Sequence, residues 1–163
     1  METKQHNLSR KRINRLKAQG YLNHTDNKIC ELAFGHRFAL IACTTILGFG
    51  VATANVPILA GIAIVALGGV ILPYHPFDYI YNYVLSGILN RPKQPPRSKQ
   101  LKFACVIATM GISGTALLFY VGFTTAGYIL GGSLFLVAFT VSTTDFCLPS
   151  MIYNFLFKVK IDT

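Results

Sequence analysis

Two long apolar segments dominate the pattern of hydrophobic and polar positions along the chain. No Asp, Glu, Lys or Arg occurs between Phe38 and Pro73, or between Phe103 and Thr144. A membrane-spanning helix needs about 20 apolar residues, so each segment has the length of two crossings. Turn-forming sequences at residues 55–57 and 124–126 divide the two segments. The pattern therefore predicts an all-α membrane protein with four transmembrane helices in two hairpins, over residues 33–54, 57–73, 103–123 and 127–144.

An amphipathic pattern follows each predicted hairpin. After the first hairpin, apolar residues recur at helical spacing on one face, while polar residues occupy another face. The apolar residues are Phe77, Ile80, Tyr81, Val84, Leu85 and Ile88, and the polar ones are Asp78, Asn82 and Ser86. This pattern predicts an interfacial helix over residues 76–90, and a second one starts at Pro149. Tyrosine is typical of membrane interfaces, which makes Tyr74, Tyr79, Tyr81 and Tyr153 the predicted interfacial anchors.

The distribution of basic residues predicts the orientation. The chain has 163 residues, 15 Lys and Arg, a formal net charge of +9 and only 13% charged residues. All 15 lie in the segment up to Arg37, in the loop at residues 91–102, or at the C-terminus, and none lies in the two predicted turns. The positive-inside rule then places both termini and the long loop in the cytoplasm. We expect the basic residues to interact with the lipid bilayer, and we do not expect nucleic acid as a binding partner.

The chain divides into four predicted segments. A basic cytoplasmic tail over residues 1–32 precedes the first hairpin and its interfacial helix over residues 33–90. A Pro-rich basic loop at 91–102 leads to the second hairpin and helix at 103–163. Within the tail, Ser9 can start a short helix that Gly20 ends. We interpret this tail as a solvated segment that sets orientation; the alternative is a helix lying on anionic headgroups.

The two halves also resemble each other. Arg37-Phe38-Ala39 and Lys102-Phe103-Ala104 open the two hairpins, and Ile80-Tyr81-Asn82 and Ile152-Tyr153-Asn154 follow them. Both hairpins enter from the same side, which predicts a parallel pseudo-repeat. In the second hairpin, Gly127 and Gly131 form a GxxxG pattern that favours close helix packing.

One group of residues is a candidate for chemistry. The repeat places His75, Asp78, Asp145 and Cys147 at equivalent helix ends on the cytoplasmic side. Helix capping and packing explain these residue types adequately, and the alternative is a shared thiol–imidazole or metal site. The four cysteines have no CxxC spacing, and no HExxH, GxxxxGK or GxSxG pattern occurs. The sequence indicates no cofactor and predicts no enzymatic activity.

Several short sequences together resemble a known family. They are His75-Pro76-Phe77-Asp78, Asn90-Arg91-Pro92, Lys102-Phe103-Ala104-Cys105 and Phe146-Cys147-Leu148-Pro149-Ser150. The chain is similar, over residues 32–158, to the small, mainly bacterial membrane proteins known as domain of unknown function 4395. The resemblance implies a compact helical unit in the bacterial inner membrane, without an established activity. Many members have Cys-x-x-Cys at the last of these sequences, so Ser150 replaces the second cysteine and argues against a dithiol redox role.

Three functions remain open from the sequence. The first hypothesis is a structural or accessory subunit of a membrane complex, whose partners are other membrane proteins or further copies of this chain. The alternatives are a thiol-based redox or sulfur-handling membrane protein that uses Cys147, and an oligomeric small transporter. The transporter ranks third because the predicted spans contain few polar residues.

Overall fold

A computed structural model describes residues 8–22 and 24–159 of the chain. Within this part the chain is helical and forms no strand. The long helices are α2 (Asp26–Ala52), α3 (Val56–Ile71), α6 (Lys99–Tyr120) and α7 (Thr124–Thr144). The short ones are α1 (Arg10–Leu16), η1 (Lys17–Tyr21), α4 (Pro76–Ile80), η2 (Tyr81–Leu85), α5 (Ser86–Ile88) and α8 (Leu148–Leu156), where η marks a π-helical turn.

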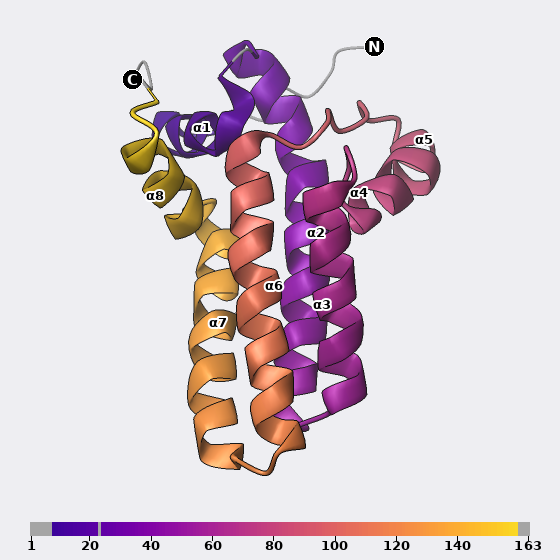
Figure 1. The fold of residues 1–163 in the computed structure, drawn as a ribbon. Coiled ribbons are helices and arrows are strands. Elements are labelled where there is room, and N and C mark those ends of the chain that lie inside the picture. The colour runs from indigo at the N-terminus through magenta and orange to yellow at the C-terminus, as the bar shows by residue number, and fades with distance from the viewer. Residues whose placement is uncertain (1–7, 23, 160–163) are drawn as a thin grey trace.

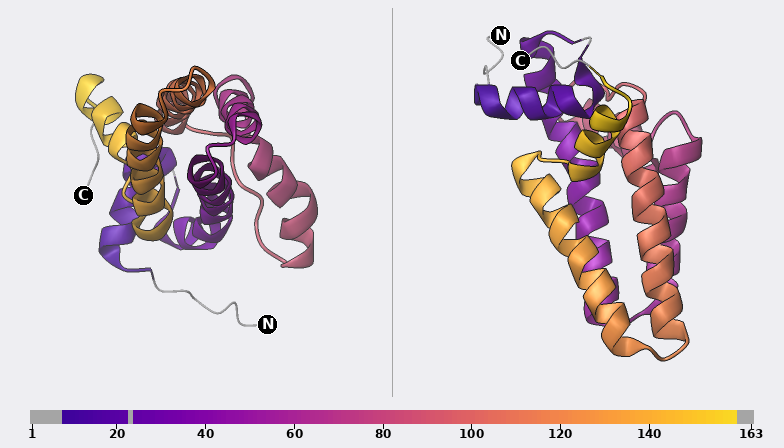
Figure 2. Two further views of the ribbon diagram at one scale, coloured as in Figure 1. Left: turned by 90° about the horizontal axis from the view of Figure 1, so that it is seen from below. Right: turned by 60° about the vertical axis from the view of Figure 1, so that its left-hand side comes forward.

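The four long helices form a bundle, and the short helices gather at one of its ends (Figure 1). Around the bundle, α2 contacts α3 and α7, while α6 contacts the same two helices from the other side. Figure 2 shows this arrangement along the bundle and from the side. The opposite end carries only the α2–α3 and α6–α7 turns. The end with the short helices is called the polar end below.

The lengths and compositions of the helices fit a membrane protein. Helices α2, α6 and α7 are each long and apolar enough to cross a membrane, and α3 together with α4–α5 forms a fourth candidate that is bent by 78°. Large apolar side chains such as Phe49, Ile64 and Ile129 are mostly exposed on the outside of the bundle. In water such a surface would be unfavourable, whereas lipid tails cover it without cost.

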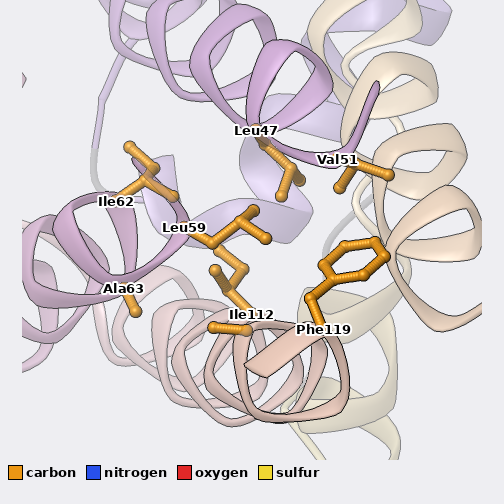
Figure 3. Packing of buried hydrophobic residues seen from close by; sticks show 8 residues of the cluster. Leu47, Val51, Leu59, Ile62, Ala63, Ile112 and Phe119 are labelled. Carbon is orange, nitrogen blue, oxygen red and sulfur yellow. The ribbon is translucent and has the colours of Figure 1, made fainter. Parts of the chain in front are cut away.

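The interior toward the turn end is packed with aliphatic and aromatic side chains (Figure 3). The buried members are Leu47, Val51, Leu59, Ile62, Ala63, Ile112, Ala116 and Phe119. Close packing of α7 depends on its glycines: a Cβ on Gly131 would lie 2.8 Å from side chains of Val51 and Thr115, and one on Gly127 would lie 2.7 Å from the Phe119 ring. Both glycines therefore face the inside of this bundle.

The N-terminal segment differs from the predicted solvated tail. Helix α2 begins at Asp26, with Thr25 as its extended N-cap residue, and not at Ala33 as predicted. Its first turns bury Ile29 and Leu32 against Ile13 and Leu16 of α1. Burial of this apolar face stabilises the association, because removing apolar surface from water is favourable. The short helix after Ser9 exists, but it is docked on the bundle; residues 1–7 lie outside the described part.

The segment after α3 also differs from the prediction in one respect. Tyr81 was predicted to be an interfacial anchor, but its side chain is completely buried, with its ring beside those of Phe34 and Phe38. Asn82 and Ser86 are buried too, whereas Tyr83 and Ile88 are exposed. The polar face of α4–α5 thus points toward the protein, where Asn82 binds Gln94, while Ile80, Val84 and Ile88 of the apolar face are exposed.

Candidate functional site

An apolar cavity of about 160 Å³ lies between the four long helices, near the polar end. Its walls are mostly aliphatic, including Leu47, Ile112 and Val141. Polar side chains line it as well: Cys43, His75, Arg97, Cys105 and Cys147. An apolar cavity of about 150 Å³ stays dry and holds a molecule the size of benzene. The site therefore combines room for a small molecule with three thiols.

Each of the three sulfur atoms accepts a hydrogen bond from a different donor. Cys43 Sγ lies 3.8 Å from His75 Nε2, and Cys105 Sγ accepts from Arg97 Nη1 at 3.7 Å. Cys147 Sγ accepts from Ser150 Oγ at 3.1 Å. Donors aimed at sulfur stabilise the negative charge of a thiolate, whereas burial in an apolar cavity opposes it. The donors thus favour thiolate formation at a site whose burial favours the neutral thiol.

His75 is fixed by the start of α4. It is the N-cap residue, its Nδ1 accepts from the Phe77 amide at 3.3 Å, and Asp78 Oδ2 accepts from the His75 amide at 3.2 Å. With Nδ1 as acceptor, the neutral ring carries its proton on Nε2, the nitrogen that faces Cys43. Gly69 makes room for the ring, since a Cβ there would lie 2.5 Å from His75 Cδ2. His75 therefore donates to the thiol and also caps the helix.

The environment of His75 predicts a loss of stability in acid. Burial lowers the pKa of His75 from 6.5 to about 4, and the nearby Arg97 charge acts in the same direction. The unfolded chain binds this proton near pH 6.5 and the folded chain does not, so the contribution to stability is complete above pH 6.5 and is lost as the pH falls toward 4. We expect the melting temperature in detergent to fall more over this range for the wild type than for His75→Asn, which keeps a capping side chain. Equal losses would contradict this interpretation.

Arg97 and Asp78 form a buried ion pair beside the cavity. Arg97 Nε donates to Asp78 Oδ2 at 2.8 Å, and the two side chains are 7% and 5% exposed. Burial lowers the pKa of Arg97, but the Asp78 carboxylate, together with Cys105 and Tyr21, outweighs burial and raises the pKa above the ordinary value. The guanidinium is therefore permanently charged. Arg97 was not predicted as a site residue, because the basic loop was interpreted as an orientation signal; the signal that could have indicated it is the neighbouring Ser98, which caps α6.

Asp145 and Asp78 have different ion-pair partners, and neither lines the cavity. Asp145 is fully buried in a left-handed conformation (φ 56°) at the end of α7. Its carboxylate pairs with Arg12 at 2.6 Å and with Arg37 at 3.0 Å. Of the four predicted residues, the cavity brings together His75 and Cys147. The two other thiols, Cys43 and Cys105, were not among the predicted site residues.

Cys147 occupies the N-cap position of the nine-residue helix α8. Burial raises the pKa of its thiol, and the hydrogen bond from Ser150 acts in the opposite direction. Ser150, three residues after Cys147, thus acts as a hydrogen-bond donor to its sulfur. Across residues 8–22 and 24–159, no group of three or more His, Cys, Asp or Glu side chains is arranged to hold a metal ion.

A chain of buried polar side chains connects the N-terminal segment to the loop before α6. Tyr21 Oη donates to Gln94 Oε1 at 3.2 Å and lies 3.3 Å from His36 Nδ1. Asn82 binds both the amide and the carbonyl group of Gln94, whose side chain donates to the Leu32 carbonyl oxygen at 2.8 Å. The loop was predicted to stay in water, but Gln94 is 4% exposed. These bonds hold Arg97 in position.

The sequence matches one known protein family. The sequence model described as domain of unknown function (DUF4395) matches residues 34–158, which include every residue that lines the cavity except Gln19. The chain belongs to this family. No curated protein and no solved structure matches the chain. Membership of this family assigns no function to the DUF4395 protein, so its function has to be argued from the site itself.

Proposed function

We propose that this DUF4395 protein is a thiol-based membrane protein that takes a small, largely apolar molecule into the cavity between its long helices. One observation carries the proposal: three thiols from separate parts of the chain line one cavity, and each has a hydrogen-bond donor on its sulfur. Structural thiols in a core need only apolar neighbours. A donor at each sulfur stabilises the thiolate, which is the reactive form in thiol chemistry, and three such donors at one cavity wall support the proposal.

The reaction that fits this site is thiol–disulfide exchange with a small neutral disulfide. A cysteine sulfur, after loss of its proton, attacks one sulfur of the incoming molecule, and a new S–S bond forms. The other half leaves as a thiolate and takes up a proton. His75, Arg97 and Ser150 stabilise the negative sulfur at their respective cysteines. Since Ser150 stands in place of a second motif cysteine, the product at Cys147 is a mixed disulfide, as the single-thiol hypothesis requires.

The test uses methyl methanethiosulfonate, a small neutral reagent that forms mixed disulfides. In the purified protein in lipid nanodiscs, peptide mass spectrometry should detect modification of Cys43, Cys105 and Cys147. Saturating benzene should slow these three reactions, because it has the size that such a cavity accommodates, and should leave Cys30 unchanged. Ala138→Leu places a larger side chain in the cavity wall and should slow them likewise. Inert cavity thiols, or rates insensitive to both treatments, would contradict the proposal.

The orientation and the interfacial helices belong to the same proposal. The polar end carries the basic residues, so the positive-inside rule favours its cytoplasmic placement, in a bacterial inner membrane. The exposed apolar faces of α5 and α8, with Ile88 at 77% and Phe155 at 84% exposure, favour contact with the membrane interface. The site would then lie between the cytoplasm and the hydrocarbon layer, within reach of both.

A second candidate function is an accessory subunit of a membrane complex. A groove of about 410 Å³ between α3 and α6 faces outward and is lined by small residues, including Ala60, Ala63, Ser113 and Ala116. Such residues allow a further helix to approach closely. Purification of the tagged protein in mild detergent tests this role. A defined partner that is lost on Ala60→Leu supports it, and a partner-free monomer argues against it.

A further inference from the structure

One side chain of the N-terminal segment forms part of the wall of the thiol cavity at its polar end. Gln19 lines the cavity and is 1% exposed. Its Nε2 donates to the Asp145 carbonyl oxygen at 2.7 Å, and its Oε1 lies 2.9 Å from His36 Nε2. The Gln19 side chain is therefore held on two sides. It belongs to η1, which is not part of the four-helix bundle.

This segment, residues 10–21 (α1 and η1), is attached to the bundle through both polar contacts and a buried apolar cluster. Arg12 pairs with Asp145 at 2.6 Å, and Arg15 donates to the Thr144 carbonyl oxygen at 2.7 Å. Asn154 and Ser98 donate to the backbone carbonyl oxygens of Ala18 and Gln19. Ile13 and Leu16 add an apolar contact with α2. The Arg12 side chain is 29% exposed although Asp145 is buried, so water reaches the arginine side of this ion pair.

The backbone of the segment contains a natural pivot. Gly20 has φ 105°, a conformation that glycine adopts readily, and it interrupts the helix directly after Gln19. A smaller cavity of about 50 Å³ is lined by Gly20, Tyr21 and His36. It shares Arg97 and Leu101 with the thiol cavity. Displacement of residues 10–21 would remove Gln19 from the wall of the thiol cavity and Gly20 and Tyr21 from the wall of the smaller one.

We propose that residues 10–21 form a lid over the thiol cavity, that Gln19 is its plug, and that the Arg12–Asp145 ion pair is its latch. The inference rests on the proposed function and adds the route of entry: molecules dissolved in water reach the thiols when the lid opens. This account gives the buried Asp145 carboxylate a role: it joins the end of α7 to the lid through Arg12 and to α2 through Arg37.

The experiment compares two reagents of similar reactivity on the protein in lipid nanodiscs. Methyl methanethiosulfonate is neutral and can arrive through lipid, whereas its sulfonatoethyl analogue is charged and must arrive through water. Arg12→Ala should increase the rate at which the charged reagent modifies Cys105 and Cys147 by about tenfold, since it removes a hydrogen bond between charged groups. The neutral reagent should gain much less. Arg10→Ala, an exposed arginine on the same helix, is the matched control and should change neither rate.

Arg12→Lys distinguishes loss of the Arg12–Asp145 ion pair from a general loss of folding. It keeps the charge that pairs with Asp145, and we expect it to restore most of the protection against the charged reagent. Similar rates for Arg12→Ala and Arg10→Ala, with cavity thiols that still react with the neutral reagent, would overturn the lid and leave the proposed function intact. Cavity thiols inert to both reagents in every variant would overturn both proposals. A gain in Arg12→Ala that Arg12→Lys fails to reverse would overturn the ionic latch.

Discussion

Replacing Arg97 with methionine should lower the free energy of unfolding by about 3–5 kcal/mol, the usual cost of breaking a buried ion pair from one side. The variant leaves the Asp78 carboxylate, 5% exposed, without its 2.8 Å partner. The loss should appear in SDS titration of the protein in mixed micelles. Asp78→Asn keeps an acceptor for the His75 amide, so the double variant with Arg97→Met should recover part of the stability, since no unpaired charge stays buried.

The matched control for Arg97 is an exposed ion pair of the same protein. Lys28 and Glu31 lie 3.3 Å apart, with side chains 46% and 48% exposed. Surface pairs contribute about 0–1 kcal/mol, so Glu31→Ala should have little effect. If Arg97→Met were as mild as Glu31→Ala, the guanidinium would have to be solvated, and the account of Arg97 as a fixed donor to Cys105 would be wrong.

The second large effect concerns the core next to the cavity. Leu59 of α3 is completely buried among Leu47, Val51 and Phe119, so Leu59→Ala should destabilise the bundle by about 2–5 kcal/mol through lost contacts and the space left behind. Ile64 lies on the same helix with 69% exposure. In the proposed membrane setting, Ile64→Ala loses only contacts with lipid and should cost much less. The same SDS titration gives both values.

Equal destabilisation by the two α3 substitutions would contradict this packing. It would mean that α3 is rotated, with Ile64 inside and Leu59 toward lipid. Because Ile62 and Ala66 of α3 also line the cavity, such a rotation would remove the cavity as described. The pair of variants therefore checks the helix orientation on which the site depends.

The long helices could be predicted from the sequence because lipid imposes a simple rule. Every backbone group must be bonded within the segment, so charge-free runs of sufficient length become helices. The bounds differ at Asp26, where α2 extends into a charged region. There the helix is stabilised by packing of Ile29 and Leu32 on α1, a tertiary contact that no local pattern encodes. The parallel repeat stays a prediction, although Asn82 and Asn154, which it aligns, both bind backbone of another segment.

The candidate site was only partly predictable for a related reason. His75 and Cys147 stood out because they occur at helix ends, where side chains meet. Cys43 and Cys105 lie inside apolar runs and look like ordinary packing residues until the helices are assembled. Arg97 and Gln94 occur in a loop rich in proline and charge, a composition typical of solvated connectors. Their burial results from bonds to Asp78 and Asn82, which lie on a different segment.

The most direct test of the central claim asks whether the three thiols share one cavity. Benzyl methanethiosulfonate delivers a benzene-sized group, which a cavity of about 160 Å³ can hold only once. Intact mass spectrometry of a Cys30→Ser variant, treated in nanodiscs, should therefore show one benzyl group per folded chain, distributed over Cys43, Cys105 and Cys147, and three groups after unfolding in SDS. Two or three groups on the folded chain would show that the thiols occupy separate spaces, and the account of a single thiol-lined site would be wrong.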